Sequence, residues 1–236
     1  MKSTQRMFAL LLSICILLSV STLTAQASPD TSSPSVIPIK DFLAVTTARS
    51  AIWKELNQGK AASATVAITD SGQTVYAEGF GMANREKAIP VDKNTLFNIG
   101  SVSKVYCTAA VMVLVDEGKI DLDKPVYTYL PQFSMADPRY KDITVRMLLS
   151  HSSGLPGSHY GNSFTYSPYD GYKAALLSSL AYSHLKHTPG AMAIYCNDGF
   201  TLAEILVETV SGKSFPQFLK EKIFTPLALN ATGVNV

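Results

Sequence analysis

The sequence predicts an α+β fold, in which antiparallel strands come early and helices fill the rest of the chain. Residues 41–56 carry apolar side chains at helical spacing. Residues 64–69 and 74–80 are β-rich and are separated by the turn sequence Asp70-Ser71-Gly72, which is typical of a hairpin. From residue 102 onward the apolar spacing is again helical. Strands grouped apart from a run of helices are typical of this fold class.

The most apolar of the expected helices spans residues 102–115 and ends at Asp116-Glu117-Gly118. A helix that is apolar nearly all round is expected to be buried, and a glycine suits the left-handed position after its last turn. We therefore expect a buried central helix here. Further helices are expected at residues 126–130, 144–149, 172–180, 200–210 and 215–223.

The N-terminal residues are typical of a secretory signal peptide. Lys2 and Arg6 precede the uncharged apolar run 7–20, and Ala25-Gln26-Ala27 has the small-x-small pattern of a cleavage site. We expect residues 1–27 to direct export to the periplasm, the cell surface or the medium. A retained membrane anchor is the alternative, although the run is shorter than the roughly 20 apolar residues of a span.

The remaining chain gives no electrostatic reason to expect nucleic acid or a membrane as partner. Of the 20 basic residues, two lie in the leader, which leaves 18 against 18 acidic residues and removes the formal net charge of +2. Residues 28–39, which are rich in Ser and Pro, are expected to be a flexible lead-in to one domain over residues 40–236.

Ser101 and Lys104 have Ser-x-x-Lys spacing, and helix residues three apart share a face. Ser101 would lie in the first helical turn, where unpaired N–H groups and the positive helix end favour an alkoxide. Burial and the same helix end would lower the pKa of Lys104, so that a neutral amine takes the serine proton. Ser103 is expected to line the same pocket or to cap the helix. A second copy of the spacing, residues 183–186, lies in a polar stretch and is interpreted as solvated chain.

Tyr195-Cys196-Asn197 is a second candidate site element. In extended chain, side chains two residues apart point the same way, so Tyr195 and Asn197 can face one site while Cys196 faces away. A similar tripeptide at residues 160–162 lacks the flanking Pro189-Gly190 and the following helix. Tyr195 as an ordinary core tyrosine is the alternative.

The positions of the histidines do not predict a metal site, and we expect no cofactor. Their positions lack metal-ligand spacing, and His151 is interpreted as structural because it precedes the turn-rich residues 152–157. A Gly-x-Ser-x-Gly elbow is also absent, which argues against an α/β-hydrolase.

The motifs together resemble the class C β-lactamase and penicillin-binding-protein family. The resemblance covers the chain from about residue 40 to its end, and its segments follow the family order. They are residues 97–104, 117–126, 143–156, Pro189-Gly190, Tyr195-Cys196-Asn197 and residues 224–227.

The resemblance implies roles for the matched residues. Ser101 would be acylated, Lys104 and Tyr195 would share the acid–base work, and Asn197 would hold the substrate amide. The substrate would be a β-lactam, a D-Ala-D-Ala peptide of peptidoglycan or an ester. The fold would join an antiparallel sheet flanked by helices to a helical domain, with the site between them. We expect a monomer without a cofactor.

The family also has a late sheet strand with Lys-Thr-Gly or His-x-Gly, which supplies one of two oxyanion N–H groups. Nothing after Asn197 matches it. We therefore expect the domain to lack the family's C-terminal strands and helix, and losing one oxyanion donor costs roughly 10²–10³-fold in rate. The chain is then either a serine hydrolase or a truncated remnant that at most binds ligand.

Cys107 and Cys196 are the cysteines beyond the leader. If the site elements converge, their sulfurs could lie close enough for a disulfide in an exported protein. Two buried free thiols are the expectation that we prefer.

Overall fold

A computed structural model describes residues 39–158 and 171–234 of the chain. The described residues form two compact units, 39–78 and 79–234. The expected signal peptide, nearly all of the lead-in and the tripeptide at residues 160–162 lie outside the described residues, so these expectations stay predictions. In the described part of the chain, no helix is both long and apolar enough to cross a membrane.

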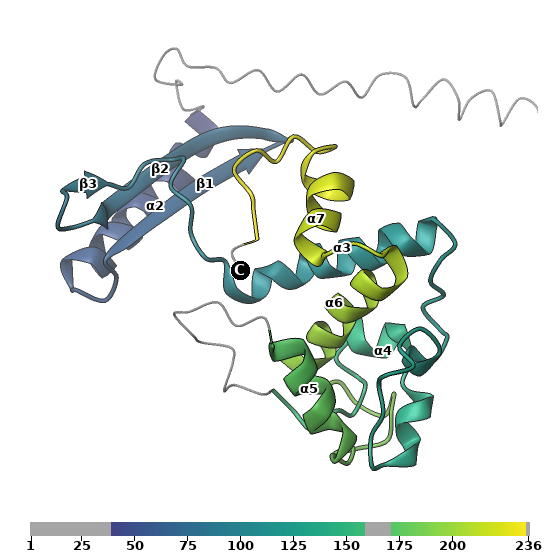
Figure 1. The fold of residues 1–236 in the computed structure, drawn as a ribbon. Helices are drawn as coiled ribbons and strands as arrows, with labels where there is room; N and C mark the ends of the chain where they lie inside the picture. Colours follow the sequence, from purple (N-terminus) through teal and green to yellow (C-terminus); the bar gives the residue numbers. More distant parts are fainter. Residues whose placement is uncertain (1–38, 159–170, 235–236) are drawn as a thin grey trace, which may run out of the picture. The chain divides into compact units, whose positions relative to one another are not determined.

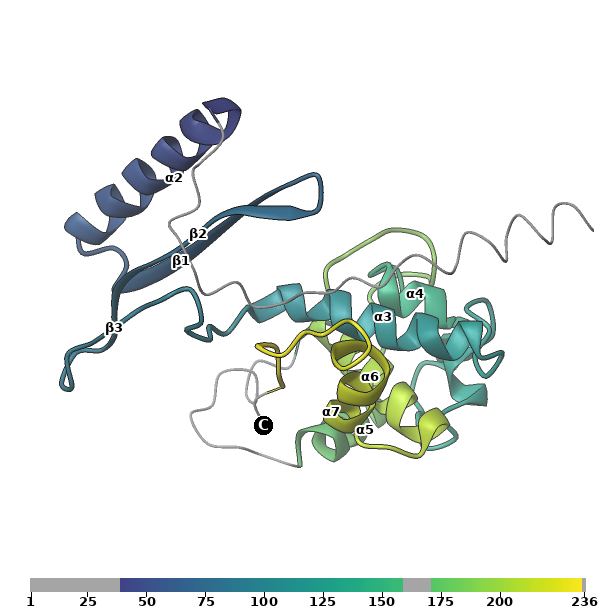
Figure 2. The same ribbon diagram turned by 90° about the horizontal axis from the view of Figure 1, so that it is seen from above.

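The first unit contains the predicted helix and hairpin. Helix α2 (Ile39–Asn57) packs against strand β1 (Ser63–Asp70), and strand β2 (Gln73–Asn84) begins in this unit (Figure 2). Ser71 and Gly72 have φ values of 51° and 77°, as a two-residue hairpin turn requires. The helix and both strands are confirmed, each extended by a few residues. Ion pairs Lys40–Asp70 and Arg49–Glu78 join α2 to the hairpin.

The sheet has the order β1-β2-β3, and β3 (Ile89–Pro90) was not predicted. It pairs antiparallel with β2, with Met82 opposite Pro90. Gly79 of β2 permits a close approach of the returning chain, because a Cβ there would lie 2.6 Å from the Val91 carbonyl oxygen. A strand of two residues is too short to show alternation in sequence.

The second unit is largely helical, and its α-helices begin within about three residues of the predicted ranges, whereas the 3₁₀ turns η1 and η3 were not predicted (Figure 1). The expected helix 126–130 is only a short 3₁₀ turn, and the last predicted helix continues as a π-helix. The elements are η1 (Gly100–Val102), α3 (Ser103–Asp116), η2 (Val126–Thr128), η3 (Pro138–Asp142), α4 (Val145–Leu149), α5 (Tyr172–Ala181), α6 (Asn197–Ser211), α7 (Phe215–Leu219) and the π-helix η5 (Lys220–Phe224).

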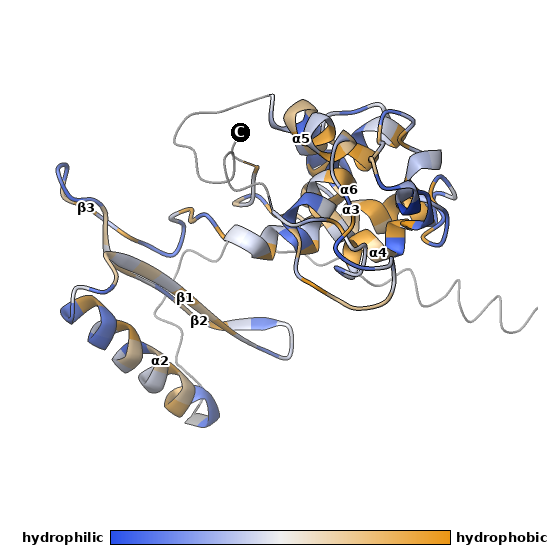
Figure 3. Ribbon diagram, turned by 90° about the horizontal axis from the view of Figure 1, so that it is seen from below, coloured by the Kyte–Doolittle hydropathy of each residue, from blue (hydrophilic) through white to orange (hydrophobic). Residues whose placement is uncertain are grey.

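The core of this unit forms where α3 and α4 pack against α6, and hydrophobic residues gather at these contacts (Figure 3). Val111 and Leu114 of α3 and Leu202 and Leu206 of α6 are fully buried. Burial of one such leucine side chain contributes about 2 kcal/mol. Packing between α3 and α6 therefore fixes the positions of the residues at their N-terminal ends.

The expectation that the central helix is buried all round is wrong. Cys107 and Leu114 lie on the buried face of α3, but Val105 is 65 % exposed and Met112 is 38 % exposed. The buried residues of α3 are spaced three or four apart and so form one stripe of the helix: Cys107, Ala110, Val111 and Leu114. Lys104 is accordingly half-buried rather than buried.

Candidate active site

Ser101 lies in the 3₁₀ turn η1 directly before α3, not in the first turn of the α-helix as predicted. Gly100 has a φ of 51°, and its N–H donates a 2.8 Å hydrogen bond to the Asn98 side-chain oxygen. A left-handed glycine lets the chain turn sharply at this point. The turn leaves Ser101 exposed at the start of α3.

Lys104 connects Ser101 to the start of α6. Its ammonium donates hydrogen bonds to Ser101 Oγ at 3.1 Å and to Asn197 Oδ1 at 2.7 Å. The same nitrogen lies 4.8 Å from the centre of the Tyr195 ring and 5.5 Å from that of Phe200. The lysine head thus has two hydrogen-bond acceptors and two aromatic rings around it.

Tyr195 completes the cluster, because its hydroxyl lies 2.5 Å from Ser101 Oγ. Hydrogen bonding to Lys104, and then to Ser101, lowers the pKa of the Tyr195 phenol. The side chain is 52 % exposed, so the hydroxyl pair is open to a ligand. A tyrosine with a lowered pKa at a serine hydroxyl can remove the serine proton.

The alternation expected at residues 195–197 is present. Tyr195 and Asn197 point toward Ser101 and Lys104, whereas Cys196 is buried and its thiol donates a 2.9 Å hydrogen bond to the Gly157 carbonyl. The structure thus brings the four predicted site residues together, while their catalytic roles stay predictions.

Residues 151–158 form a loop against this segment, and the sequence reasoning did not find their part in the site. The Cys196 N–H donates a 3.1 Å hydrogen bond to His151 Nδ1, and the Asn197 N–H donates one of 3.0 Å to Ser158 Oγ. Phe200 was also missed, although it contacts both His151 and the Lys104 ammonium. The turn-rich sequence predicted a loop here, but it did not indicate that the loop accepts hydrogen bonds from the segment before α6.

Cys107 and Cys196 are free, buried thiols, in agreement with the preferred expectation. Burial raises the pKa of Cys107 to about 12 and also raises the pKa of Cys196. Because the thiolate is the reactive form of cysteine, both thiols are in their unreactive form near neutral pH.

The second Ser-x-x-Lys copy differs from the first in its surroundings. The Ser183 hydroxyl donates a 2.8 Å hydrogen bond to the Ser179 carbonyl, just past the end of α5. Lys186 is exposed, in keeping with the predicted solvated segment. The two copies thus differ in their contacts, and which serine reacts stays a prediction.

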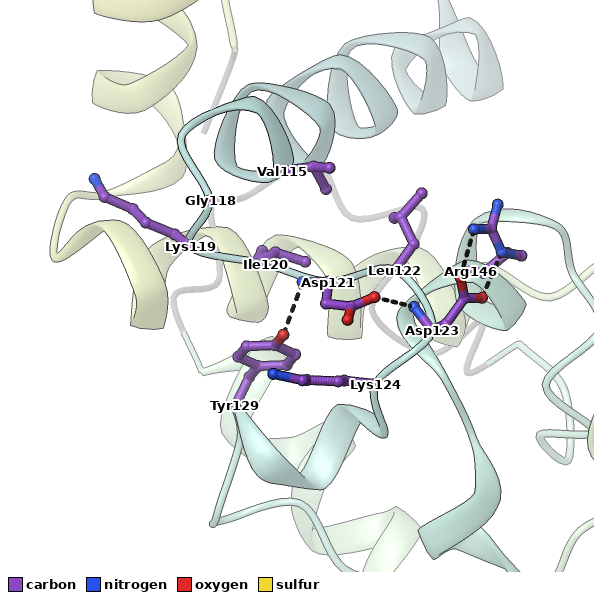
Figure 4. Close-up of a pocket in the computed structure, with 10 residues that line it drawn as sticks. All are labelled: Val115, Gly118, Lys119, Ile120, Asp121, Leu122, Asp123, Lys124, Tyr129 and Arg146. Atoms are coloured by element: carbon purple, nitrogen blue, oxygen red, sulfur yellow. Dashed lines mark hydrogen bonds and ion pairs between the residues drawn. The ribbon is translucent and has the colours of Figure 1, made fainter.

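A pocket of about 540 Å³ lies where α3 ends, with Val115 and Gly118 in its lining (Figure 4). Its polar groups bond one another: the Asp121 N–H donates to the Tyr129 hydroxyl, and Arg146 pairs with Asp123. These bonds hold the turn after α3 in place. Among the residues described, no three His, Cys, Asp or Glu side chains gather as metal ligands would.

The family model described as "Beta-lactamase" matches residues 44–236 of this chain. The chain belongs to the beta-lactamase family. A penicillin-binding protein of Bacillus subtilis (strain 168) is 28% identical over 189 residues, which are 78% of this chain and 40% of that protein. The chain spans about 40% of the length of the curated relatives it matches first.

Two solved structures are similar in fold to this chain. EstCE1, a hydrolase with promiscuous acyltransferase activity, is 27% identical with a TM-score of 0.68, over 81% of this chain and 53% of that one. A class C beta-lactamase in complex with cefoxitin is 22% identical with a TM-score of 0.70, over 84% and 53% of the two chains. The predicted α+β fold of the β-lactamase and penicillin-binding-protein type is thereby confirmed.

Proposed function

We propose that this chain is a serine hydrolase that cleaves an amide or ester carbonyl through an acyl-enzyme on Ser101. The observation that carries the proposal is the group of short distances around one hydroxyl. Ser101 Oγ lies 2.5 Å from the Tyr195 hydroxyl and 3.1 Å from the Lys104 ammonium. A nucleophile within hydrogen-bond reach of its base, which is in turn held by a third group, is the general arrangement for covalent catalysis.

The proposed reaction has two halves, and the same side chains act in both. Ionised Tyr195 removes the Ser101 proton as Oγ attacks the substrate carbonyl, and the phenol then protonates the leaving amine or alcohol. In the second half Tyr195 removes a proton from water, which attacks the acyl carbonyl, and Ser101 recovers its proton. Lys104 stabilises the phenolate throughout, in keeping with the lowered pKa of Tyr195.

Asn197 has two parts to play in this proposal. Its side-chain oxygen already accepts the 2.7 Å hydrogen bond from Lys104. The amide nitrogen on the same side chain is a donor, and we propose that it binds the carbonyl oxygen of the substrate's amide. Asn197 would then orient the base-stabilising lysine and the substrate together.

We propose a β-lactam, a D-Ala-D-Ala peptide or a simple ester as the substrate. Each presents a carbonyl that a serine can acylate, and the four residues at the site suit all three. The family name and the penicillin-binding relatives favour the first two classes. The similarity to a hydrolase with promiscuous acyltransferase activity favours a wider acyl range.

A panel of substrates with matched serine variants tests the proposal. Wild-type protein, Ser101→Ala and Ser183→Ala are each mixed with a chromogenic cephalosporin, a D-Ala-D-Ala peptide and an activated aryl ester. We expect product from at least one substrate with the wild type and with Ser183→Ala, and none above background with Ser101→Ala. Equal rates in both alanine variants would contradict the proposal. Acylation without product release would instead identify a ligand-binding remnant.

We also propose that residues 1–27 direct export of the protein. The support is the sequence pattern of basic residues, apolar run and Ala-x-Ala site. N-terminal sequencing of the protein recovered outside the cytoplasm should begin at Ser28. A chain that begins at Met1 and remains in the membrane fraction would indicate the retained anchor.

A further inference from the structure

His151 stands in a left-handed backbone conformation, which is uncommon for residues other than glycine. Its φ is 59°, in the left-handed region, where a Cβ crowds the following carbonyl group. Such a conformation persists only when surrounding contacts hold it, and it is found disproportionately at functional sites. The contacts of His151 therefore indicate which part of the site this conformation supports.

Three consecutive residues of the segment before α6 contact His151. Its carbonyl oxygen accepts a 2.8 Å hydrogen bond from the Ile194 N–H, and its Nδ1 accepts one of 3.1 Å from the Cys196 N–H. Between them, the Tyr195 ring lies 4.5 Å from the imidazole, centre to centre, with the planes tilted by 35°. The imidazole also lies 5.1 Å from the Phe200 ring, so it fills the space between Tyr195 and α6.

These contacts require one protonation state of the imidazole. Nδ1 can accept the Cys196 N–H only when it carries no proton, so the neutral ring has its proton on Nε2. Burial, followed by the nearby Lys104 ammonium, lowers the pKa of His151. Among the residues that the structure describes, the titratable groups around the ring are Lys104 from α3 and Tyr195 and Cys196 from the segment before α6.

We propose that neutral His151 is a positioning residue, which holds the Tyr195 phenol against Ser101 for the reaction proposed above. The inference rests on that proposed function. It assigns no proton transfer to His151, because Tyr195, not His151, contacts the Ser101 hydroxyl. Protonation of Nδ1 replaces an acceptor with a donor that faces the Cys196 N–H, and it adds a positive charge beside Lys104. The segment then shifts and the phenol leaves its place at Ser101.

Two substitutions distinguish the role of the Nδ1 acceptor of His151 from the role of its ring. His151→Asn retains an acceptor oxygen near the position of Nδ1, tolerates the left-handed backbone and has no titration near neutral pH. His151→Phe retains a ring beside Tyr195 but leaves the Cys196 N–H without its acceptor. The exposed His184 supplies the matched control, His184→Asn. Thermal unfolding verifies that each variant is folded.

The first measurement is the rate of Ser101 acylation from about pH 5 to pH 8, the range in which histidine titrates. We expect His151→Phe to be slower by about 10²-fold, the effect of a misplaced reacting group. His151→Asn should retain most of the neutral-pH rate and should lose only the part of the fall toward acid pH that comes from protonation of His151, so that its profile keeps the limb set by Tyr195 ionisation. The wild type and His184→Asn should show both parts. Wild-type rates and an unchanged pH profile in both His151 variants would overturn the inference.

The second measurement needs no substrate and separates this inference from the proposed function. Tyr195 ionisation is followed by ultraviolet difference spectra against Tyr195→Phe. We expect the pKa of Tyr195 to rise in His151→Phe, because the displaced phenol lies farther from Lys104, and to change little in His151→Asn. A Tyr195 titration unchanged in His151→Phe would refute the positioning role, even if the wild type acylates at Ser101. Absence of acylation in the wild type would count against the proposed function alone.

Discussion

The side-chain oxygen of Asn197 accepts a 2.7 Å hydrogen bond from the Lys104 ammonium. Asn197 is the first residue of α6, and Lys104 is the second residue of α3, so this bond joins the N-terminal ends of the two helices that pack in the core. The core packing therefore determines how Lys104 meets Ser101, and changes at Asn197 should act through the lysine.

Asn197→Ala should slow acylation of Ser101 by about 10²-fold, because the lysine loses its orienting partner and the substrate loses a donor. The exposed Asn230→Ala serves as the control. Single-turnover acylation rates measure the effect. A wild-type rate in Asn197→Ala would show that Lys104 needs no such partner.

Lys104→Met should raise the pKa of Tyr195 toward its ordinary value, since hydrogen bonding to Lys104 is the main cause of its lowering. The phenolate required as base then forms only at higher pH, so the rising limb of the acylation profile moves upward. The rate near neutral pH should fall by roughly 10²–10⁴-fold. Tyrosine difference spectra measure the pKa of Tyr195, and acylation rates at a series of pH values measure the shift of the rising limb and the loss of rate.

Lys186→Met, in the second Ser-x-x-Lys copy, is the matched control for that substitution. It should leave both the Tyr195 titration and the acylation profile as in the wild type. If Lys104→Met also leaves the Tyr195 titration unmoved, the lysine does not support the phenolate.

Asp137→Asn should lower Tm at neutral pH. The Asp137 carboxylate is buried, accepts two hydrogen bonds from the Arg139 guanidinium and accepts the Leu185 N–H at 3.2 Å. The Arg139 guanidinium holds the pKa of Asp137 well below its ordinary value. Its contribution is thus complete above the pKa of the unfolded chain, about 3.9, and is lost as pH falls through the lower folded pKa.

The difference in Tm between the wild type and Asp137→Asn should therefore shrink as the pH falls from about 7 to about 2. Asp142→Asn, at an exposed position, should show little difference at any pH. A gap between wild type and Asp137→Asn that grows toward acid pH would contradict the assigned ion pair.

Leu206→Ala should destabilise the helical unit by about 3 kcal/mol, because it opens a cavity where α6 meets the core. The exposed Thr209→Ala on the same helix should change stability by less than about 0.5 kcal/mol. Denaturant unfolding of the two variants measures the contrast. Equal stabilities would mean that the α6 contacts contribute little.

Much of the fold followed from sequence periodicity, and the exceptions have physical reasons. The helices at α5 and α6 have enough turns to show their apolar spacing, whereas β3 has two residues and no period. The exposed face of α3 was unpredictable, because apolar residues all round a helix do not reveal which side meets a partner. Val105 is the example, at 65 % exposed.

The candidate site residues were predictable where they lie close together in the sequence. Ser101 and Lys104 lie three residues apart, and Tyr195 and Asn197 lie two apart. His151 and Ser158 were missed because they act on backbone N–H groups 45 and 39 residues later in the chain. Neither distance leaves a local pattern in the sequence.

Mass spectrometry of the protein after brief treatment with a fluorescent penicillin and with an activated ester tests the central claim most directly. We predict a covalent acyl group on the peptide that contains Ser101, in the wild type and in Ser183→Ala, and none in Ser101→Ala. An acyl group on any other residue, or an adduct that persists in Ser101→Ala, would contradict the assignment of Ser101 as the nucleophile.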